Sequence, residues 1–214
     1  RDLFVADVDS DGDLDIVAAG YNDTVEWYEN DGSANPIWTA NVITTDLGSN
    51  GEKTDVHVAD MDGDGDLDIL SLSQTEDTVS WYENDGTPSD GEWTHHIVKD
   101  YTGNGMEDVF VADIDGDGDL DIISAEGGGD KILYHINDGT PGNGVWTTNT
   151  VVSGTNADGV LSVHVADIDS DGDLDIAAAL FMAQKTIWIE NDGSPNDGGW
   201  TSHDVYASDS GKDP

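Results

Sequence analysis

One acidic phrase occurs four times in this chain of 214 residues. The four copies read VADVDSDGDLDI from Val5, VADMDGDGDLDI from Val58, VADIDGDGDLDI from Val111 and VADIDSDGDLDI from Val165. Their leading aspartates are Asp7, Asp60, Asp113 and Asp167, spaced 53, 53 and 54 residues apart. A fixed period of this length is typical of folds that stack one supersecondary unit on the next. The chain must therefore fold as four similar units.

Each phrase has the ligand layout of a calcium loop. Counted from the leading aspartate, positions 1, 3, 5, 7 and 9 are Asp and position 6 is Gly. Ca²⁺ takes about six to eight oxygen ligands, and a tightly coiled run of alternating carboxylates supplies them. The position-6 glycines (Gly12, Gly65, Gly118 and Gly172) permit the sharp turn that folds the odd positions onto one ion. The sequence predicts four Ca²⁺ per chain.

Two other interpretations of the loops are weaker. Acidic Asp/Gly runs also occur as solvated turns, but five carboxylates in nine residues repel one another unless a cation is present. Mg²⁺ prefers a small octahedral site that keeps several waters. An EF-hand needs Glu at position 12 and flanking helices, whereas position 12 is Ala18, Ser71, Ser124 or Ala178 and the flanks alternate at strand period. A strand–loop–strand hairpin is expected instead.

The rest of the repeat predicts four short strands. After the VAD and LDI segments come Thr24–Gly32, Thr78–Gly86, Lys131–Gly139 and Lys185–Gly193, which all end in Asn-Asp-Gly. A Trp-Thr pair then opens a last strand at Trp38, Trp93, Trp146 and Trp200. Asn-Asp-Gly and Asp-Gly are turn formers, and no segment has a convincing helical period. Four antiparallel strands in each of four tandem repeats predict an all-β fold of β-propeller blades.

Aromatic residues recur at two positions of the repeat. Trp27, Trp81, Tyr134 and Trp188 share one position, and the Trp-Thr tryptophans share the other. Both sets are expected to fill the gaps between blades; an aromatic platform for sugars is the alternative.

These motifs resemble the FG-GAP/VCBS repeat family, which is related to the calcium-bearing blades of integrin α-subunit propellers. The resemblance covers essentially the whole chain. It implies that positions 1, 3, 5 and 9 bind calcium through carboxylates and position 7 through its backbone carbonyl. The implied carboxylate ligands are Asp7, Asp9, Asp11, Asp15, Asp60, Asp62, Asp64, Asp68, Asp113, Asp115, Asp117, Asp121, Asp167, Asp169, Asp171 and Asp175. The implied carbonyl ligands are Asp13, Asp66, Asp119 and Asp173. The Phe-Gly and Gly-Ala-Pro signatures of the integrin branch are missing, so integrin-type ligand recognition does not follow.

Composition restricts the partners. The formal net charge is −41, with six Lys and Arg against 47 Asp and Glu. Such a surface repels nucleic-acid phosphate and anionic lipid, so neither is an expected partner. No transmembrane run or cysteine is present. Oxygen-rich calcium sites suit millimolar calcium outside the cell, so a secreted or cell-surface location is expected.

The domain prediction is one β-propeller region over residues 1–214, with repeats of approximately 1–54, 55–107, 108–161 and 162–214. Three arrangements stay open: four blades within a larger propeller, which is slightly favoured, a four-bladed ring, and half of an eight-bladed dimer. Additional blades from the rest of the protein would complete the larger propeller, and self-association would complete the eight-bladed dimer.

No catalytic constellation is recognisable, and the protein is expected not to be an enzyme. His57 and His164 occupy the strand position of Phe4 and Phe110, which indicates packing. The leading interpretation is an adhesion or recognition module for a glycan or protein, part of a larger extracellular protein. A polysaccharide lyase-like propeller and a structural or filament subunit are the alternatives.

The ligand is expected away from the calcium loops. The connectors Leu47–Thr54, Tyr101–Glu107 and Gly154–Gly159 differ in length and content, whereas the loops scarcely vary. Variable loops on a rigid repeated scaffold are where recognition usually occurs.

Overall fold

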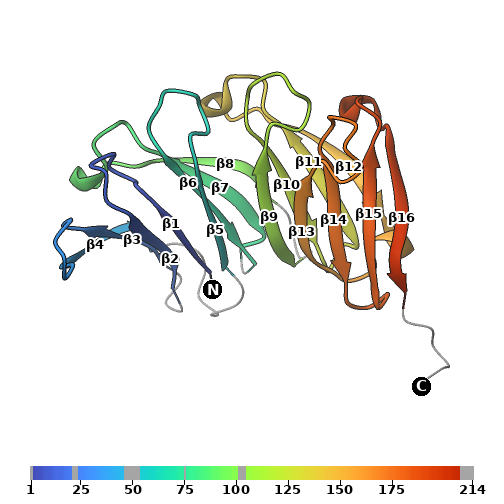
Figure 1. The fold of residues 1–214 in the computed structure, drawn as a ribbon, viewed down its shortest axis with the longest axis horizontal. Coiled ribbons are helices and arrows are strands. Elements are labelled where there is room, and N and C mark those ends of the chain that lie inside the picture. The colour runs from blue at the N-terminus through green and yellow to red at the C-terminus, as the bar shows by residue number, and fades with distance from the viewer. Residues whose placement is uncertain (1, 21–23, 46–53, 75, 101–104, 208–214) are drawn as a thin grey trace. The chain divides into compact units, whose positions relative to one another are not determined.

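The computed structural model describes residues 2–20, 24–45, 54–74, 76–100 and 105–207 (Figure 1). Of the connectors named above, Leu47–Thr54 and Tyr101–Glu107 both lie partly outside the described residues. The connector Gly154–Gly159 lies within them.

The described residues form four antiparallel four-stranded sheets, each with its strands in sequence order. Blade 1 comprises β1 (Leu3–Ala6), β2 (Asp15–Ala19), β3 (Val25–Asn30) and β4 (Trp38–Thr44). Blade 2 comprises β5 (Thr54–Ala59), β6 (Asp68–Ser73), β7 (Thr78–Glu83) and β8 (Thr94–Asp100). Blade 3 comprises β9 (Met106–Ala112), β10 (Asp121–Glu126), β11 (Lys131–Ile136) and β12 (Thr147–Ser153). Blade 4 comprises β13 (Val160–Ala166), β14 (Asp175–Leu180), β15 (Lys185–Asn191) and β16 (Trp200–Ala207). The predicted all-β fold of four-stranded blades is confirmed.

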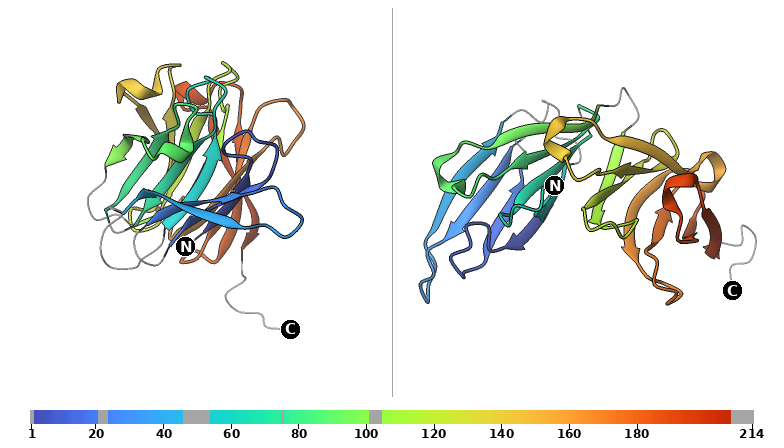
Figure 2. Two further views of the ribbon diagram at one scale, coloured as in Figure 1. Left: turned by 90° about the vertical axis from the view of Figure 1, so that its left-hand side faces the viewer. Right: turned by 90° about the horizontal axis from the view of Figure 1, so that it is seen from above.

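The first two strands of each blade make the expected hairpin around the acidic loop. In blade 2, Ala59 pairs with Asp68 at the loop end and Thr54 with Ser73 at the far end. The second strand of blade 1 buries every other residue, as expected at period two, whereas β6 of blade 2 and β10 of blade 3 are buried along their whole length. Figure 2 shows the twist of the sheets in two further views.

Two features were not foreseen. The stretch before three of the Trp-Thr strands contains a single 3-10 turn, at Pro88–Asp90, Pro141–Asn143 and Pro195–Asp197. In addition, the pairing of the third and fourth strands shifts register in every blade, next to Val25, Val79, Ile132 and Thr186. A bulge adds a residue to one strand of a pair, which an alternation pattern read strand by strand does not reveal. Among the described residues, no helix is long and apolar enough to cross a membrane.

The chain divides into two compact units, each with its own apolar core. In the first unit, Val8, Val17 and Trp27 of blade 1 pack with Val56 and Val58 of blade 2. In the second unit the same positions of blades 3 and 4 meet, as in the contact of Ile114 with the cluster around Val163 and Val165. The aromatics Trp27, Trp81 and Tyr134 are fully buried, as the packing role predicted for them requires, whereas Trp188 is half-buried and Trp38 is 42% exposed.

The histidines on the first strands also pack between neighbouring blades. The rings of Phe4 and His57 lie 4.7 Å apart within the first unit, and those of Phe110 and His164 lie 4.6 Å apart within the second. The predicted packing role fits His57, which is half-buried, whereas His164 contacts Phe110 but stays exposed.

Candidate metal centre

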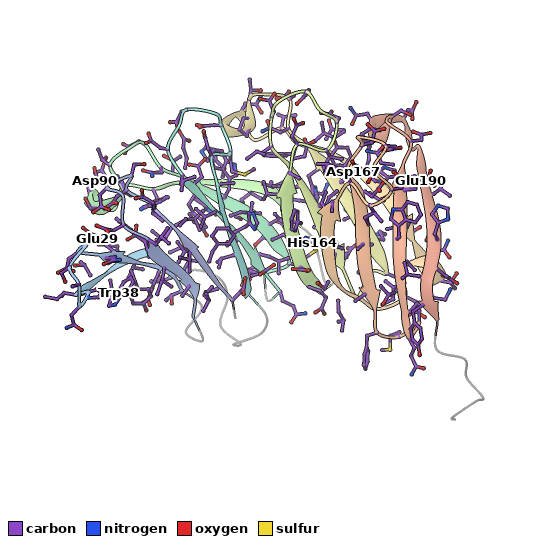
Figure 3. All side chains as sticks on the ribbon, viewed as in Figure 1. Glu29, Trp38, Asp90, His164, Asp167 and Glu190 are labelled. Atoms are coloured by element: carbon purple, nitrogen blue, oxygen red, sulfur yellow. The ribbon has the colours of Figure 1, made fainter. Side chains whose placement is uncertain are left out.

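Each acidic loop brings three carboxylates together. The grouped aspartates are those at positions 1, 3 and 9, with one oxygen of each within 4.8 Å of the others. Two oxygens bound to one Ca²⁺ at roughly 2.3–2.6 Å are at most about 5 Å apart, so this spacing fits a shared ion. The groups are Asp7, Asp9 and Asp15; Asp60, Asp62 and Asp68; Asp113, Asp115 and Asp121; Asp167, Asp169 and Asp175. In Figure 3, Asp167 lies where β13 runs into its loop, at the upper end of these strands in this view.

The position-9 aspartate anchors the loop to the sheet. Asp68 is fully buried at the start of β6 and accepts hydrogen bonds from the backbone N–H of Met61 and of Asn84, each at 2.8 Å. Asp15 and Asp175 make the equivalent pair of bonds. One carboxylate thus ties the loop's second residue to the end of the third strand.

The carboxylates at positions 1, 3 and 5 shape the loop from within. In blade 1, Asp7 accepts from the N–H of Gly12 at 3.0 Å, and Asp9 accepts from that of Asp11 at 3.2 Å. Asp11 in turn accepts from the N–H of Asp13 at 2.9 Å. Gly12 takes a φ of 99°, a left-handed backbone that only glycine adopts without strain. The alternating carboxylates therefore fold the loop around themselves.

The position-5 carboxylates, on Asp11, Asp64, Asp117 and Asp171, are exposed and are not part of the grouped oxygens. Their predicted role as ligands stays a prediction.

The position-7 carboxylates lie against a different part of the blade. A Cβ added to Gly32 would come within 2.1 Å of Oδ2 of Asp13, and one added to Gly86 within 2.8 Å of Oδ2 of Asp66. These side chains therefore lie beside the glycine of the Asn-Asp-Gly turn. That placement is compatible with the backbone carbonyl, and not the carboxylate, facing an ion.

Burial makes the charged form of these acids costly. It raises the pKa of Asp9 and Asp62, whose neighbouring carboxylates act in the same direction. Burial also raises the pKa of Asp68 to about 8, although two backbone N–H groups oppose the shift. A divalent cation would remove this cost by neutralising the cluster.

Two of the loops each contain a buried carboxylate oxygen that a bound cation would satisfy. Among the described residues, Oδ1 of Asp7 and Oδ1 of Asp113 are buried and have no hydrogen-bond partner. A buried carboxylate oxygen without a partner is strongly disfavoured. Because every donor in the cluster is a carboxylate or carbonyl oxygen, the set matches the hard-cation preference of Ca²⁺.

Sequence reasoning missed one contributor, the asparagine of the Asn-Asp-Gly turn. Besides its N–H bond to Asp68, Asn84 donates from Nδ2 to the carbonyl of Leu67 at 3.1 Å and to that of Val8 at 3.5 Å. It therefore holds its own loop and the loop of blade 1. The fourfold recurrence of this residue, at Asn30, Asn84, Asn137 and Asn191, was the available signal.

A cavity of 480 Å³ lies in the second unit, at the ends of the strands opposite the loops. The turn Gly127–Asp130 forms one wall, and Asp158–Leu161 at the start of β13 forms another. Glu107, Phe181 and Met182 complete the lining. Because β13 runs from Val160 to Ala166, the cavity and the loop of Asp167 are separated by the strand's length, roughly 20 Å.

The repeats and the fold are both similar to those of known proteins. The model of the FG-GAP-like repeat matches three overlapping segments, residues 7–71, 60–124 and 113–178, and each match begins at the first aspartate of a loop. No curated protein matches the chain. A solved structure described as the basis of specific recognition of non-reducing terminal N-acetylglucosamine by an Agrocybe aegerita lectin is similar, with a TM-score of 0.61 and 24% identity. The match covers 96% of this chain and 52% of that one, so the chain spans about half the length of this neighbour. Repeat, loop and blade together place the chain in the FG-GAP-like repeat family.

Proposed function

We propose that the protein is a calcium-stabilised recognition module that binds a neutral glycan at the connector end of its blades. The observation that carries the proposal is the 480 Å³ cavity at the strand ends opposite the acidic loops. Ions in the loops would hold the blades rigid, and the opposite edge would be free to contact a ligand.

Calcium is the ion that the loops suit best. The carboxylates at positions 1, 3, 5 and 9 with the position-7 carbonyl would hold it, and its charge would neutralise the cluster. We expect four Ca²⁺ per chain in metal analysis after desalting into calcium-free buffer of low chelating power. A transition metal in the loops, or no bound ion, would contradict this assignment.

The cavity lining favours a neutral, hydroxyl-rich ligand. Phe181 and Met182 present exposed apolar surface, on which the apolar face of a sugar ring can lie. Glu107, Asp130 and Asp158 supply carboxylate acceptors for hydroxyl groups. Among the described residues, no Lys or Arg lines the cavity to compensate the charge of an acidic sugar. The N-acetylglucosamine named for the lectin of similar fold belongs to this neutral class.

An extracellular setting suits both parts of the proposal. Calcium is millimolar there, and extracellular calcium modules bind at roughly 10⁻⁴–10⁻³ M. Salt also screens the charge of −41, which would otherwise hold surfaces apart. Adhesion to a glycan-bearing surface is the role that follows.

The test is a glycan array probed in 10 mM calcium, followed by titration with free N-acetylglucosamine. Replacing Phe181 with Ala should weaken binding about fivefold, because the lost stacking contact is worth about 1 kcal/mol. The matched control is Val145→Ala, which removes another exposed apolar side chain outside the cavity. The glycan should be recovered unchanged.

Two outcomes would count against the proposal. One is binding that survives Phe181→Ala but is lost in Asp9→Ala while the protein stays folded, because the loop would then be the binding site. The other is cleavage of the glycan, which would favour the lyase-like alternative.

A further inference from the structure

Blade 2 contains a second cavity, of 250 Å³, on one face of its third and fourth strands. Its floor comes from Ser80 and Tyr82 of β7 and from His95 and Ile97 of β8. The rings of Tyr82 and His95 stack with their centroids 4.9 Å apart, and Ile97 is 48% exposed, so the floor has a polar and an apolar part. The volume is below the roughly 300–1,000 Å³ of pockets for drug-sized molecules. The cavity therefore suits a small ligand group.

Two carboxylates line one end of this cavity. Glu76 lies in the turn before β7, and Asp100 is the last residue of β8, directly opposite Thr78 in the strand pairing. Within the part of the chain that the structure describes, no Lys or Arg lines the cavity. Lys99 pairs with Val79, one residue along, so its side chain points to the other face of the sheet. The two carboxylates are therefore not compensated inside the cavity.

The floor of the cavity contains a hydroxyl group without a partner. Ser80 is 3% exposed and lines the cavity, and its Oγ makes no hydrogen bond to any residue that the structure describes. Leaving a buried polar group unpaired costs free energy. This hydroxyl can accept a hydrogen bond, as the carboxylates can. The cavity is therefore suited to a ligand group that donates hydrogen bonds.

The neighbouring repeats indicate which donor fits this place. In blade 4, Lys185 occupies the position of Thr78, and its Nζ donates to both carboxylate oxygens of Asp204, at 2.9 and 3.0 Å. In blade 3, Lys131 occupies the same position, with its Nζ 3.2 Å from Oε2 of Glu126. Two blades thus place their own ammonium group beside a carboxylate at this point of the third strand. Blade 2 has a threonine and a cavity there instead.

We propose that the cavity of blade 2 binds a primary ammonium group on a short alkyl stem, in the place that Lys185 holds in blade 4. A primary ammonium has three N–H donors, which match the carboxylates of Glu76 and Asp100 and the hydroxyl of Ser80. Methylene groups of the stem would lie on the exposed side chain of Ile97, as lysine stems lie on apolar surface. The net charge of −41 would also attract a cation toward the protein.

A metal ion suits this cavity less well. Over the described ranges of the chain, every group of three acidic or histidine side chains close enough to share an ion lies in an acidic loop. Glu76, His95 and Asp100 do not form such a group, so their donor atoms are too spread out for one ion. Acceptors that surround a cavity fit the diverging N–H groups of an ammonium better.

Two sources offer this chemical group, a diffusible alkylamine and the lysine side chain of another protein. The experiment therefore uses two probes, n-pentylamine and a capped Gly-Lys-Gly peptide. It follows the methyl resonances of Ile97 by NMR as each probe is added at neutral pH, in 10 mM calcium and about 150 mM salt. Saturable shifts at Ile97 are expected, and the probe that binds more tightly identifies the source.

The control ligand is n-pentyltrimethylammonium, which has the same charge and stem but no N–H. It should bind at least about fivefold more weakly than n-pentylamine, because it cannot donate to the carboxylates. Equal affinity for the two compounds would overturn the proposal, because binding would then reflect only the overall charge of the chain. No saturable shift at Ile97 with either probe would overturn it as well.

Two variants test the site itself. Thr78→Lys gives blade 2 the residue of blades 3 and 4, and it should abolish the shifts because its own ammonium would fill the cavity. Asp100→Asn should weaken binding about fivefold through the loss of a charged acceptor. Asp100 is exposed, so this variant should fold, as circular dichroism would verify. Binding that survives both substitutions unchanged would overturn the proposal.

The matched control variant is Glu92→Gln. Glu92 is an exposed residue of the same blade outside the cavity, and its substitution raises the net charge by the same amount as either test variant. It should bind n-pentylamine as the wild type does. Phe181→Ala alters only the 480 Å³ cavity of the second unit and should not change amine binding either. A negative result here would therefore leave the glycan proposal standing.

Discussion

Chelating calcium is expected to unfold the chain or to lower its melting temperature by about 20–40 °C. A ligand that binds only the folded state adds about 2.7 kcal/mol per site at a hundredfold excess over Kd, as with 10 mM calcium and a Kd near 10⁻⁴ M. Four independent sites would add about 11 kcal/mol, which is comparable with the whole stability of a typical domain. For a domain of this size, each kcal/mol shifts Tm by about 2–4 °C.

The measurement is thermal unfolding followed by circular dichroism, in excess EGTA and in 10 mM calcium. Sodium chloride should be adjusted to equal ionic strength, because salt alone weakens the repulsion among 47 acidic residues. Adding back calcium should restore the original Tm, and equal magnesium should restore less of it. Identical melting curves with and without chelator would show that calcium is incidental to the fold.

The second large effect is expected at the position-9 aspartate. Asp68→Ala should destabilise the protein by about 2–6 kcal/mol more than Asp64→Ala, measured by urea unfolding in saturating calcium. Both variants should lose one bound ion, but only Asp68→Ala also leaves the buried N–H groups of Met61 and Asn84 without an acceptor. Each such buried group costs about 1–3 kcal/mol.

The control for this comparison is Asp66→Ala, whose carboxylate lies beside Gly86 and whose expected ligand is the backbone carbonyl, which the substitution keeps. It should retain four ions and most of the stability. Equal destabilisation by Asp68→Ala and Asp64→Ala would mean that the two backbone bonds add nothing beyond the metal site.

Much of the blade could be predicted because the repeat supplies its own alignment. Strand alternation, the turn formers and the loop aspartates recur in every unit, so β5, β6 and the loop between them could be placed from the sequence. The bulges and the 3-10 turns could not, because they depend on how neighbouring strands pair and not on composition. The connector at Gly154–Gly159 differs from the other connectors already in the sequence, but only the folded chain brings Asp158 close to Phe181 and Glu107.

The candidate site was predicted at the level of residue type. Positions 1, 3 and 9 come together as expected, because alternate residues of a coiled loop point inward. Their unequal roles were not foreseen. Position 9 is buried and accepts backbone N–H groups from the loop itself and from the residue after the third strand. The second bond could not be predicted, because only the folded sheet shows that Asn84 returns to the same end as the loop. The asparagine itself was interpreted only as part of a turn.

The bonds of Asp68 also bear on how the sheet avoids misalignment while it forms. One oxygen of this carboxylate receives the N–H of Met61 and the other that of Asn84, so the first hairpin and the third strand share a fixed point. A slip of one residue between β6 and β7 would move Asn84 by roughly 3.3 Å and turn the core side chains to the wrong face. Trp81 and Tyr82 are both buried in the observed register and would exchange faces in such a slip, so each ring would meet a surface packed for the other. The loops of Asp15, Asp68 and Asp175, which make this pair of bonds, therefore fix the strand register and make shifted pairings unfavourable before a neighbouring blade has packed.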